Sequence, residues 1–383
     1  MDRDFFEEIT SAELETPVFI VNEDAIKRNC EILARVQERT GCKVLLALKA
    51  FSMYSLFPVM REYLHGVCAS SPNEARLGRE EFGREVHSFA AAFSKNDFDE
   101  LLAVSDHIVF NSLSQYSLFR DSVLQNKDKI SFGLRVNPEH SQAPSAIYDP
   151  CAPGSRLGIT RKFFGNELPE GISGLHFHTL CEQNADALLS TANSFEENFA
   201  SFLPHVKWLN FGGGHHITRA DYDIDLLCEI VSRFMNKYNC MVYLEPGEAV
   251  ALNAGVLAAT VLDIVHNDVD IAILDASAAA HVADVIEMPF RPEVAFGKEP
   301  GEFDYTYRLA GLSCLAGDVF GDYSFRKPLS VGEKVFFLDM AHYTMVKTTT
   351  FNGLKLPSIA SYSKANGLRI LKQFDYKDFK SRV

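Results

Sequence analysis

The chain has 383 residues, 47% of them hydrophobic, and its 51 acidic residues outnumber 37 basic ones to give a formal net charge of −14. This apolar content is enough for two hydrophobic cores. The acidic balance disfavours a nucleic-acid partner and suits a cationic ligand.

No segment predicts export or membrane insertion. The N-terminal stretch MDRDFFEEITSAELETP lacks the basic-then-apolar order of a secretory signal. The most apolar long run, residues 249–265, is interrupted by Asn253 and Asp263 and predicts a helix followed by a strand. The eight cysteines include no C-x-x-C pair, so neither a zinc knuckle nor a disulfide framework is indicated. We therefore expect a cytoplasmic protein with no membrane span.

In chain order, TPVFIVN near residue 16 predicts a first strand, and DAIKRNCEILARVQERT predicts a helix leading into a repeating pattern. Eight short apolar runs then recur, at residues 43–50, 66–71, 85–91, 107–112, 130–137, 173–179, 207–214 and 241–247. Stretches with helical spacing separate most of them, such as SPNEARLGREEF and SQYSLFRDSVLQ. Eight such strands with intervening helices favour a closed (β/α)8 barrel over a doubly wound open sheet.

Two regions depart from the alternation. Residues 138–160 are rich in Pro, Ser and Ala and predict an extended loop. After about residue 256, longer β-type runs without regular helices predict a second, mostly β domain. The expected fold is α/β, with a barrel over residues 24–255 and a β domain formed by residues 1–23 and 256–383.

Polar residues fall at the carboxyl ends of several predicted barrel strands, the face where such barrels carry their active sites. Lys49, Arg135, His178 and Glu245 end four of them, and a glycine triplet, 212–214, ends another. A single polar residue at a strand end means little, but this set on one rim indicates a functional site.

Lys49 stands in the apolar stretch LLALKAF. A buried ammonium group costs several kcal/mol unless it is paired or loses its proton. The residue is therefore either a strand-end lysine that reaches solvent or a neutral amine that attacks a carbonyl. The glycine triplet in NFGGGHH is either a flexible turn or a phosphate-binding loop, and its position after the seventh barrel strand favours the latter.

An imine-forming lysine, a phosphate loop and an acid that can pair with a protonated pyridine nitrogen are the parts that hold pyridoxal 5'-phosphate. With these parts, the chain resembles the ornithine/diaminopimelate decarboxylase group of the alanine-racemase-fold enzymes. The resemblance extends over nearly the whole chain. It is carried, in order, by LLALKAF, GLRVNPE, GLHFHT, NFGGGHH, EPGEA, GLSCLAGD and AHYTM.

The resemblance implies a role for each matching residue. Lys49 would bond covalently to the cofactor aldehyde, His178 would stack on its ring, and Glu245 would hold the pyridinium. The remaining cofactor contacts would be Arg135, Gly213, Gly214, Gly247 and Tyr343. Cys314 would come from a partner subunit as the proton donor, which implies a homodimer with shared active sites. We expect no metal at the site.

Three departures from better-known relatives bear on the substrate. Glu248 of EPGEA replaces a usual arginine, Leu315 a common acid, and Cys181 a serine that often helps bind phosphate. An acid at position 248 would repel a second carboxylate and attract an amine, so diaminopimelate is an unsuitable substrate.

Two segments, 274–292 and 307–323, resemble the carboxynorspermidine/carboxyspermidine decarboxylases in particular. This resemblance implies removal of CO₂ from an α-amino acid with a polyamine tail, giving norspermidine or spermidine. Acidic residues would line the tail channel. The expected tail contacts are Glu248, Asp284, Asp318 and His281. The sequence leaves open which of the two substrates is preferred, because they differ by one methylene.

Other activities remain as alternatives. One is decarboxylation of another basic amino acid, of the ornithine or lysine type. His176 and His178 share a face of one strand and could bind a metal in an amidohydrolase barrel, although that family carries its H-x-H on the first strand. A racemase would need a second base, and a non-catalytic binder of the antizyme-inhibitor kind would be expected to lack Lys49 or Cys314.

Overall fold

The computed structural model describes residues 2–143 and 146–383, and within it the chain forms two compact units. One unit comprises Lys27–Val250, and the other combines Met1–Ile26 with Ala251–Val383.

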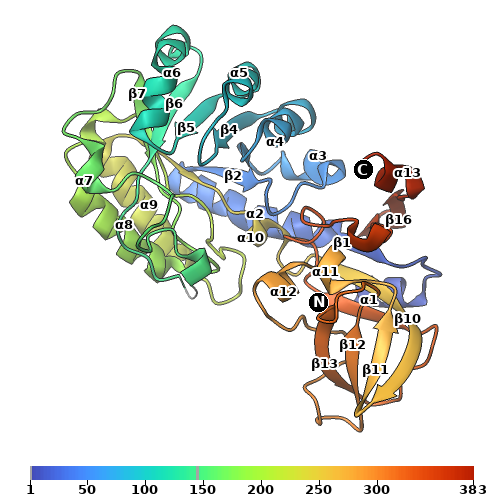
Figure 1. The fold of residues 1–383 in the computed structure, drawn as a ribbon. Coiled ribbons are helices and arrows are strands. Elements are labelled where there is room, and N and C mark those ends of the chain that lie inside the picture. The colour runs from blue at the N-terminus through green and yellow to red at the C-terminus, as the bar shows by residue number, and fades with distance from the viewer. Residues whose placement is uncertain (1, 144–145) are drawn as a thin grey trace. The chain divides into compact units, whose positions relative to one another are not determined.

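The first unit is a closed barrel of eight parallel strands, which confirms the predicted fold class (Figure 1). Each strand pairs with its sequence neighbour, and β2 closes the ring by pairing with β9. The strands are β2 (Lys43–Ala47), β3 (Gly66–Ala69), β4 (Glu85–Phe89), β5 (His107–Phe110), β6 (Ser131–Arg135), β7 (Ile172–His176), β8 (Trp208–Asn210) and β9 (Met241–Leu244). All eight lie within or almost entirely within the eight predicted apolar runs.

Helices follow the barrel strands, and several begin at a side-chain cap that the sequence supplies. Ser71, Ser94 and Ser112 each accept a hydrogen bond from a backbone N–H in the first turn of their helix, which satisfies an otherwise unpaired donor. The α-helices are α2 (Glu23–Thr40), α3 (Phe57–Met60), α4 (Pro72–Leu77), α5 (Lys95–Val104), α6 (Leu113–Asn126), α7 (Arg161–Phe164), α8 (Ala185–Phe199), α9 (Ile224–Tyr238) and α10 (Glu248–Ala251). Shorter turns are η1 (Tyr54–Leu56), η2 (Gly78–Phe82), η3 (Ala146–Tyr148) and η4 (Leu203–His205).

The barrel interior is filled by large side chains that meet small ones. Leu45, Val109, Trp208 and Tyr243 form one buried cluster. Gly174 leaves room for the Trp208 indole, because a Cβ there would overlap the ring. The predicted loop 138–160 contains only η3 as regular structure, and its residues 144–145 lie outside the described residues.

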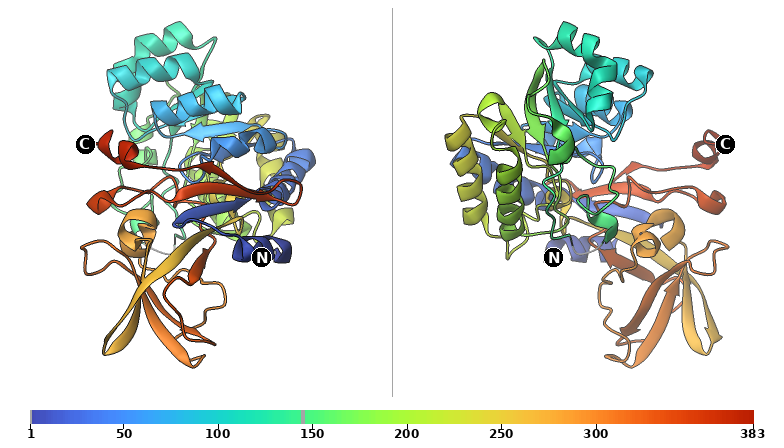
Figure 2. Two further views of the ribbon diagram at one scale, coloured as in Figure 1. Left: turned by 90° about the vertical axis from the view of Figure 1, so that its right-hand side faces the viewer. Right: turned by 60° about the vertical axis from the view of Figure 1, so that its left-hand side comes forward.

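The second unit is built on an eight-stranded sheet with the order β13-β12-β11-β10-β1-β15-β16, in which β14 also pairs with β10. Figure 2 shows β1, from the start of the chain, beside β15, from near its end. The strands are β1 (Val18–Asn22), β10 (Gly255–Asn267), β11 (Val269–Leu274), β12 (Tyr305–Ala310), β13 (Val319–Phe325), β14 (Lys334–Leu338), β15 (Ser358–Ser363) and β16 (Gly367–Lys372). The N-terminal strand thus joins the β domain, as the sequence predicts.

The helices of this unit are few and mostly short. They are α1 (Arg3–Ser11), α11 (Ala278–His281), α12 (Asp284–Glu287) and α13 (Tyr376–Lys380), with the turn η5 (Phe351–Gly353). Sequence reasoning missed α1, although Asp2 caps it and Phe5 and Ile9 provide the i, i+4 spacing that packs into the core.

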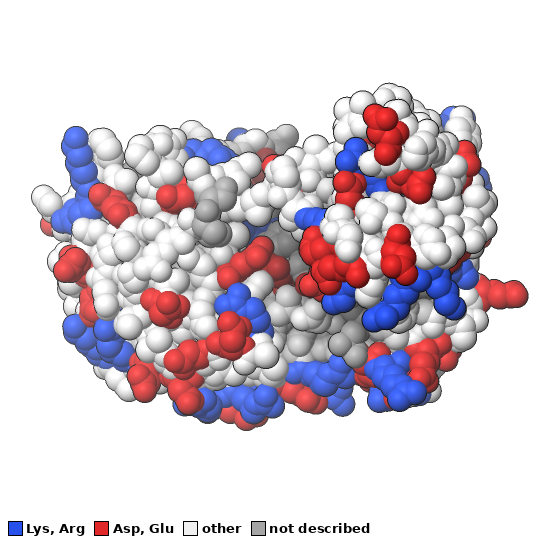
Figure 3. Space-filling model, turned by 90° about the horizontal axis from the view of Figure 1, so that it is seen from below, with Lys and Arg blue, Asp and Glu red and all other residues white. Residues whose placement is uncertain are grey.

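The segment 249–265 contains the end of α10 and most of β10, which confirms its interpretation as a helix followed by a strand. Among the described residues, none of the helices is both long and apolar enough to cross a bilayer. On the face seen in Figure 3, acidic and basic side chains lie interspersed.

Candidate functional site

Lys49 lies just beyond the end of β2, at the carboxyl face of the barrel. Its side chain is exposed, yet protein groups surround the amine closely, and desolvation lowers its pKa. The Arg135 guanidinium lowers this pKa further, whereas Glu245 and two thiols, those of Cys68 and Cys181, oppose the shift. A lowered pKa increases the fraction of neutral amine, which is the nucleophilic form.

Glu245 lies directly after β9 and is 8% exposed. Burial by itself would favour the neutral acid, but His176, Asn210 and His87 outweigh it and lower the pKa to about 2. Asn210 Nδ2 donates to Glu245 Oε1 at 2.7 Å, and His176 Nε2 lies 3.5 Å from Oε2. The carboxylate is therefore held charged and oriented.

His178 and Arg135 occupy neighbouring strand ends. Arg135 Nη2 donates to the His178 carbonyl at 2.9 Å, and its guanidinium lies over the Phe89 ring, 4.7 Å from the centroid. The His178 pKa is held well below its usual value by desolvation and then by Lys49 and Arg135. Gly213 N–H donates to His178 Nδ1 at 3.1 Å, which assigns the proton of the neutral ring to Nε2.

The glycine triplet follows β8 in a conformation that side chains would obstruct. Gly212 and Gly214 have φ values of 68° and 81°, in the left-handed region that favours glycine. A Cβ on Gly214 would overlap the Leu180 carbonyl, so the loop passes very close to the chain after β7. The amide of Gly213, a predicted phosphate contact, is bonded to His178 here, and Gly212 N–H donates to Asn210 Oδ1 at 2.8 Å.

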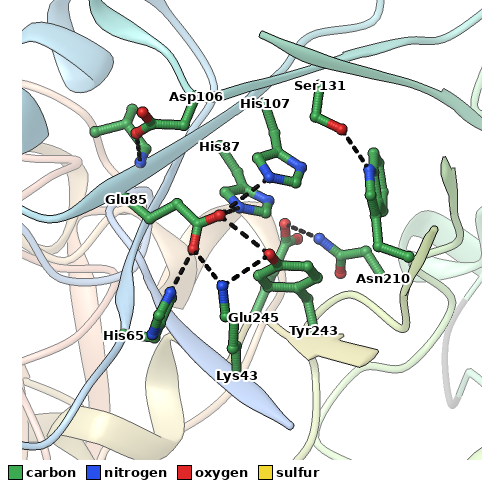
Figure 4. A network of polar contacts seen from close by, with 12 residues as sticks. Lys43, His65, Glu85, His87, Asp106, His107, Ser131, Asn210, Tyr243 and Glu245 are labelled. Atoms are coloured by element: carbon green, nitrogen blue, oxygen red, sulfur yellow. Dashed lines mark hydrogen bonds and ion pairs between the residues drawn. The ribbon is translucent and has the colours of Figure 1, made fainter. Parts of the chain in front are cut away.

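Beneath this rim, a second polar cluster centres on Glu85, near the opposite ends of the strands (Figure 4). Its carboxylate lies 3.0 Å from His107 Nε2, 3.2 Å from Lys43 Nζ and 3.0 Å from the Tyr243 hydroxyl. His65 Nε2 also contacts Glu85, at 2.5 Å.

A metal ion does not suit this lower cluster, although ligand atoms of Glu85, His87 and His107 lie within 4.8 Å of one another. The His87 and His107 rings stack with centroids 3.8 Å apart and planes 10° apart, so their lone pairs cannot converge on one ion. Lys43 already neutralises the carboxylate. We interpret the cluster as a charged support for the barrel interior.

The β unit carries the other predicted residues. Cys314 is exposed, and its backbone N–H donates to Asn352 Oδ1 at 2.8 Å. Tyr343 is half-buried and has a φ of 53°. His281 is buried, and desolvation lowers its pKa to about 4.

Asp318 is 4% exposed, and its carboxylate is hydrogen-bonded to residues of its own unit. It accepts hydrogen bonds from Ser277 Oγ at 2.8 Å, Ala279 N at 3.2 Å and Ser313 N at 2.9 Å. These bonds tether the loop that carries Cys314. A substrate contact by Asp318 stays a prediction, and the structure gives this side chain a different set of partners.

Asp284 also has a partner within the unit. Lys347 Nζ lies 2.5 Å from Asp284 Oδ1 and 2.5 Å from Glu287 Oε2. Glu248, by contrast, is on the barrel unit, at the start of α10, with Oε2 3.2 Å from His216 Nε2.

The structure thus gathers Lys49, Arg135, His178, Glu245 and the glycine loop at one end of the barrel. Three residues support Glu245, and sequence reasoning did not assign this role to them. They are Cys68, His176 and Asn210. Signals for two of them were present. Asn210 opens the NFGGGHH segment, and His176 shares the face of its strand with His178.

Known proteins resemble this chain over almost its whole length. A family model described as "Pyridoxal-dependent decarboxylase, C-terminal sheet domain" matches residues 30–341. A carboxynorspermidine/carboxyspermidine decarboxylase of Campylobacter jejuni is 44% identical over 380 residues, covering 96% of this chain and 98% of the relative. A carboxyaminopropylagmatine decarboxylase of Synechocystis is 41% identical over 372 residues, covering 97% and 96%.

A solved structure is also similar over nearly the whole chain. It is a carboxynorspermidine decarboxylase of Campylobacter jejuni complexed with norspermidine, with a TM-score of 0.90 and 43% identity. The alignment covers 97% of this chain and 100% of that one.

Proposed function

This chain belongs to the pyridoxal-dependent decarboxylases, and from that membership we propose that it decarboxylates a carboxylated triamine, carboxynorspermidine or carboxyspermidine, in polyamine biosynthesis. The observation that carries the proposal is the 44% identity, over 96% of this chain, to a relative named for both substrates. The products would be norspermidine or spermidine.

The barrel rim fits the cofactor through its own chemistry. Bound pyridoxal phosphate supplies an electron sink for the electron pair left when CO₂ departs. The lowered pKa of Lys49 suits it to hold the cofactor aldehyde covalently, and the charged, buried Glu245 suits a protonated pyridine nitrogen. The neutral His178 ring is suited to stacking. Arg135 would fix the His178 backbone.

The phosphate would be held by backbone at Gly214 and Gly247, with Tyr343 as a further contact. Gly213 can contribute only if its amide leaves His178 Nδ1, to which it donates in this structure. Close backbone packing around Gly214 supports the position of this loop.

Cys314 is the proposed proton donor, from a partner subunit of a cytoplasmic homodimer. Its exposure in the single chain suits a thiol that acts on a neighbouring molecule. A positioned acid of this kind contributes about 10² to 10⁴ in rate.

For the substrate tail, we propose Glu248 as the principal contact, because it lies on the barrel unit that also carries Lys49. Asp284, Asp318 and His281 remain further candidates on the β unit. Of these, Asp284 and Asp318 would first have to exchange partners within that unit.

A second candidate substrate is carboxyaminopropylagmatine, because a relative named for it is 41% identical over nearly the same span. That compound ends in a guanidinium group where the triamines end in an ammonium group. A planar guanidinium demands paired acceptors in a fixed geometry, so the two tails are distinguishable by the residues at the end of the channel.

The test is a substrate panel for the purified holoenzyme. It comprises both carboxylated triamines, carboxyaminopropylagmatine, ornithine, lysine and diaminopimelate, and CO₂ release is followed. We expect the highest kcat/KM with a carboxylated triamine. Preference for ornithine or lysine would favour the alternative basic-amino-acid decarboxylase. The named relatives give no support to the amidohydrolase or racemase alternatives.

A further inference from the structure

Three side chains that cofactor binding leaves unused meet at the carboxyl face of the barrel. Glu182 follows β7, His216 follows β8, and Glu248 follows β9, three strands that are neighbours in the barrel. One ligand atom of each lies within 4.8 Å of those of the other two.

His216 is the unusual member of this group. It is 5% exposed, and neither of its ring nitrogens makes a hydrogen bond among the described residues. Its Nε2 lies 3.2 Å from Glu248 Oε2, an ion pair once the ring is protonated. Its backbone N–H donates to the Gln183 carbonyl at 3.2 Å, which holds this loop against the residue after Glu182. A buried polar ring that lacks a hydrogen bond calls for an explanation.

Two carboxylates within 4.8 Å of each other concentrate negative charge, which favours the binding of a cation. The cluster also borders the Lys49 site. Burial, Glu182 and Glu248 together raise the pKa of the Cys181 thiol to about 11, and Lys49 opposes them, so the carboxylates of the cluster and the Lys49 amine both act on this one thiol. A cation bound at the cluster would therefore sit close to the reacting end of a substrate.

Carboxylated triamines carry a positively charged nitrogen close to their reacting end. Their inner, secondary nitrogen is separated from the α-carbon by two methylenes, whereas the side-chain ammonium of ornithine is one methylene further away and that of lysine two. An ammonium with two N–H donors suits two separate carboxylates.

We propose that Glu182 and Glu248 bind the inner secondary ammonium of the substrate, and that His216 is a positioning residue that orients Glu248. This inference rests on the proposed function and adds to it the residues that recognise a nitrogen inside the tail. The cluster would distinguish carboxylated triamines from ornithine and lysine by the distance between the α-carbon and the nearest side-chain ammonium group.

The experiment uses the holoenzyme and two substrates that differ at one atom. One is the carboxylated triamine, and the other is its carbon isostere, in which a methylene replaces the inner nitrogen. Glu182→Gln is expected to lower kcat/KM about tenfold on the triamine, the loss typical of a charge-assisted hydrogen bond, and less than about twofold on the isostere. Asp186→Asn, an equal charge change on α8, is the control and is expected to leave both values unchanged.

His216 is tested by a pair of variants. His216→Leu is expected to raise KM for the triamine with little change in kcat, and His216→Gln, which keeps a donor, is expected to restore most of the loss. Equal losses on triamine and isostere for Glu182→Gln would overturn the proposal. So would inactivation by a chelator that Zn²⁺ or Mn²⁺ reverses, since it would make the cluster a metal site.

An assay of the wild-type enzyme distinguishes failure of this proposal from failure of the proposed function. If it releases no CO₂ from carboxylated triamines, the proposed function fails. Binding of α,γ-diaminobutyrate, whose ammonium occupies the same position as the inner nitrogen, then tests the cluster directly by calorimetry. Binding that Glu182→Gln weakens about tenfold would support the cation site, and binding unaffected by this change would overturn it.

Discussion

At the scale of single residues, the site depends on holding one carboxylate charged inside the barrel. Glu245 is surrounded by His176, Asn210 and Cys68. Burial raises the Cys68 pKa well above its usual value, and Glu245 raises it further, so this thiol stays protonated and adds no second negative charge. The charge that remains on Glu245 is available to a cationic ring nitrogen.

Glu245→Gln tests this charge. Glutamine retains an oxygen that can accept the Asn210 hydrogen bond but removes the negative charge, so we expect kcat to fall at least about 100-fold, as for the loss of one partner of a buried charge pair. Steady-state kinetics at saturating cofactor provides the measurement, and Glu80→Gln, on the exposed surface of η2, is the control. A near wild-type kcat for Glu245→Gln would refute the role.

A substitution at Asp318 distinguishes two roles of this residue: support of the loop that carries Cys314, or contact with the substrate. Ser277 and Ser313 donate to one oxygen of the Asp318 carboxylate, and Ala279 donates to the other. Asp318→Asn replaces one of these two oxygens by an NH₂ group, which cannot accept, so at least one donor loses its acceptor and we expect the free energy of unfolding to fall by about 1–3 kcal/mol. Urea denaturation and KM are measured together. A higher KM with unchanged stability would instead identify Asp318 as a contact to the substrate.

At the scale of elements, polar groups at the starts of β4 and β5 support the barrel core. His87 stacks on His107 and lies 4.5 Å from the Tyr243 ring by centroids. Its pKa is lowered to about 4, first by burial and then by His107, whereas Glu85 works in the opposite direction. Glu85 itself has a pKa below its usual value, because three neighbouring histidines outweigh its burial.

These shifts predict acid destabilisation of the barrel. A histidine whose folded pKa lies below its unfolded value of 6.5 stabilises the fold above pH 6.5, and that contribution is lost as the pH falls toward about 4. The Glu85 contribution is lost at still lower pH, and so has the same sign. We expect the free energy of unfolding to decrease from about pH 7 to about pH 5, by at most about 1.4 kcal/mol per pH unit for His87.

Urea titrations at the two pH values measure this slope. His87→Phe keeps a flat ring against His107 but cannot take up a proton, so it should flatten the slope. His205→Phe, at an exposed position, should leave the slope unchanged. A slope in His87→Phe equal to that of the wild type would contradict the assignment.

At the scale of the whole molecule, the sequence was sufficient for the architecture. Parallel barrel strands are buried on both faces and therefore appear as short apolar runs, and eight such runs predicted the eight strands. The strand near residue 18 was predicted to join the β domain because no barrel helix precedes it, and it pairs with β10 and β15.

The side chains that hold the site residues in place were harder to predict, because their contacts join segments that are distant in sequence. His216 meets Glu248 across 32 residues, and Asp318 meets Ser277 across 41. Residue spacing along one strand carries no information about such pairs. Likewise, an apolar run cannot show that Gly213 N–H bonds to His178 rather than remaining open to a phosphate.

The proposed homodimer with shared active sites makes a prediction for mixed variants. Lys49→Ala and Cys314→Ala should each be inactive alone. After subunit exchange, about half of the dimers would be hybrids, each with one intact site, which gives about a quarter of wild-type activity. Activity that stays at the level of the separate variants would contradict sharing.

The measurement that tests the account most directly is borohydride reduction of the cofactor-loaded protein, followed by peptide mass spectrometry. We predict a pyridoxyl adduct on Lys49 and its loss in Lys49→Ala, together with the visible absorbance and activity, while the fold survives. An adduct on another lysine, or no adduct in a protein that still releases CO₂, would contradict it.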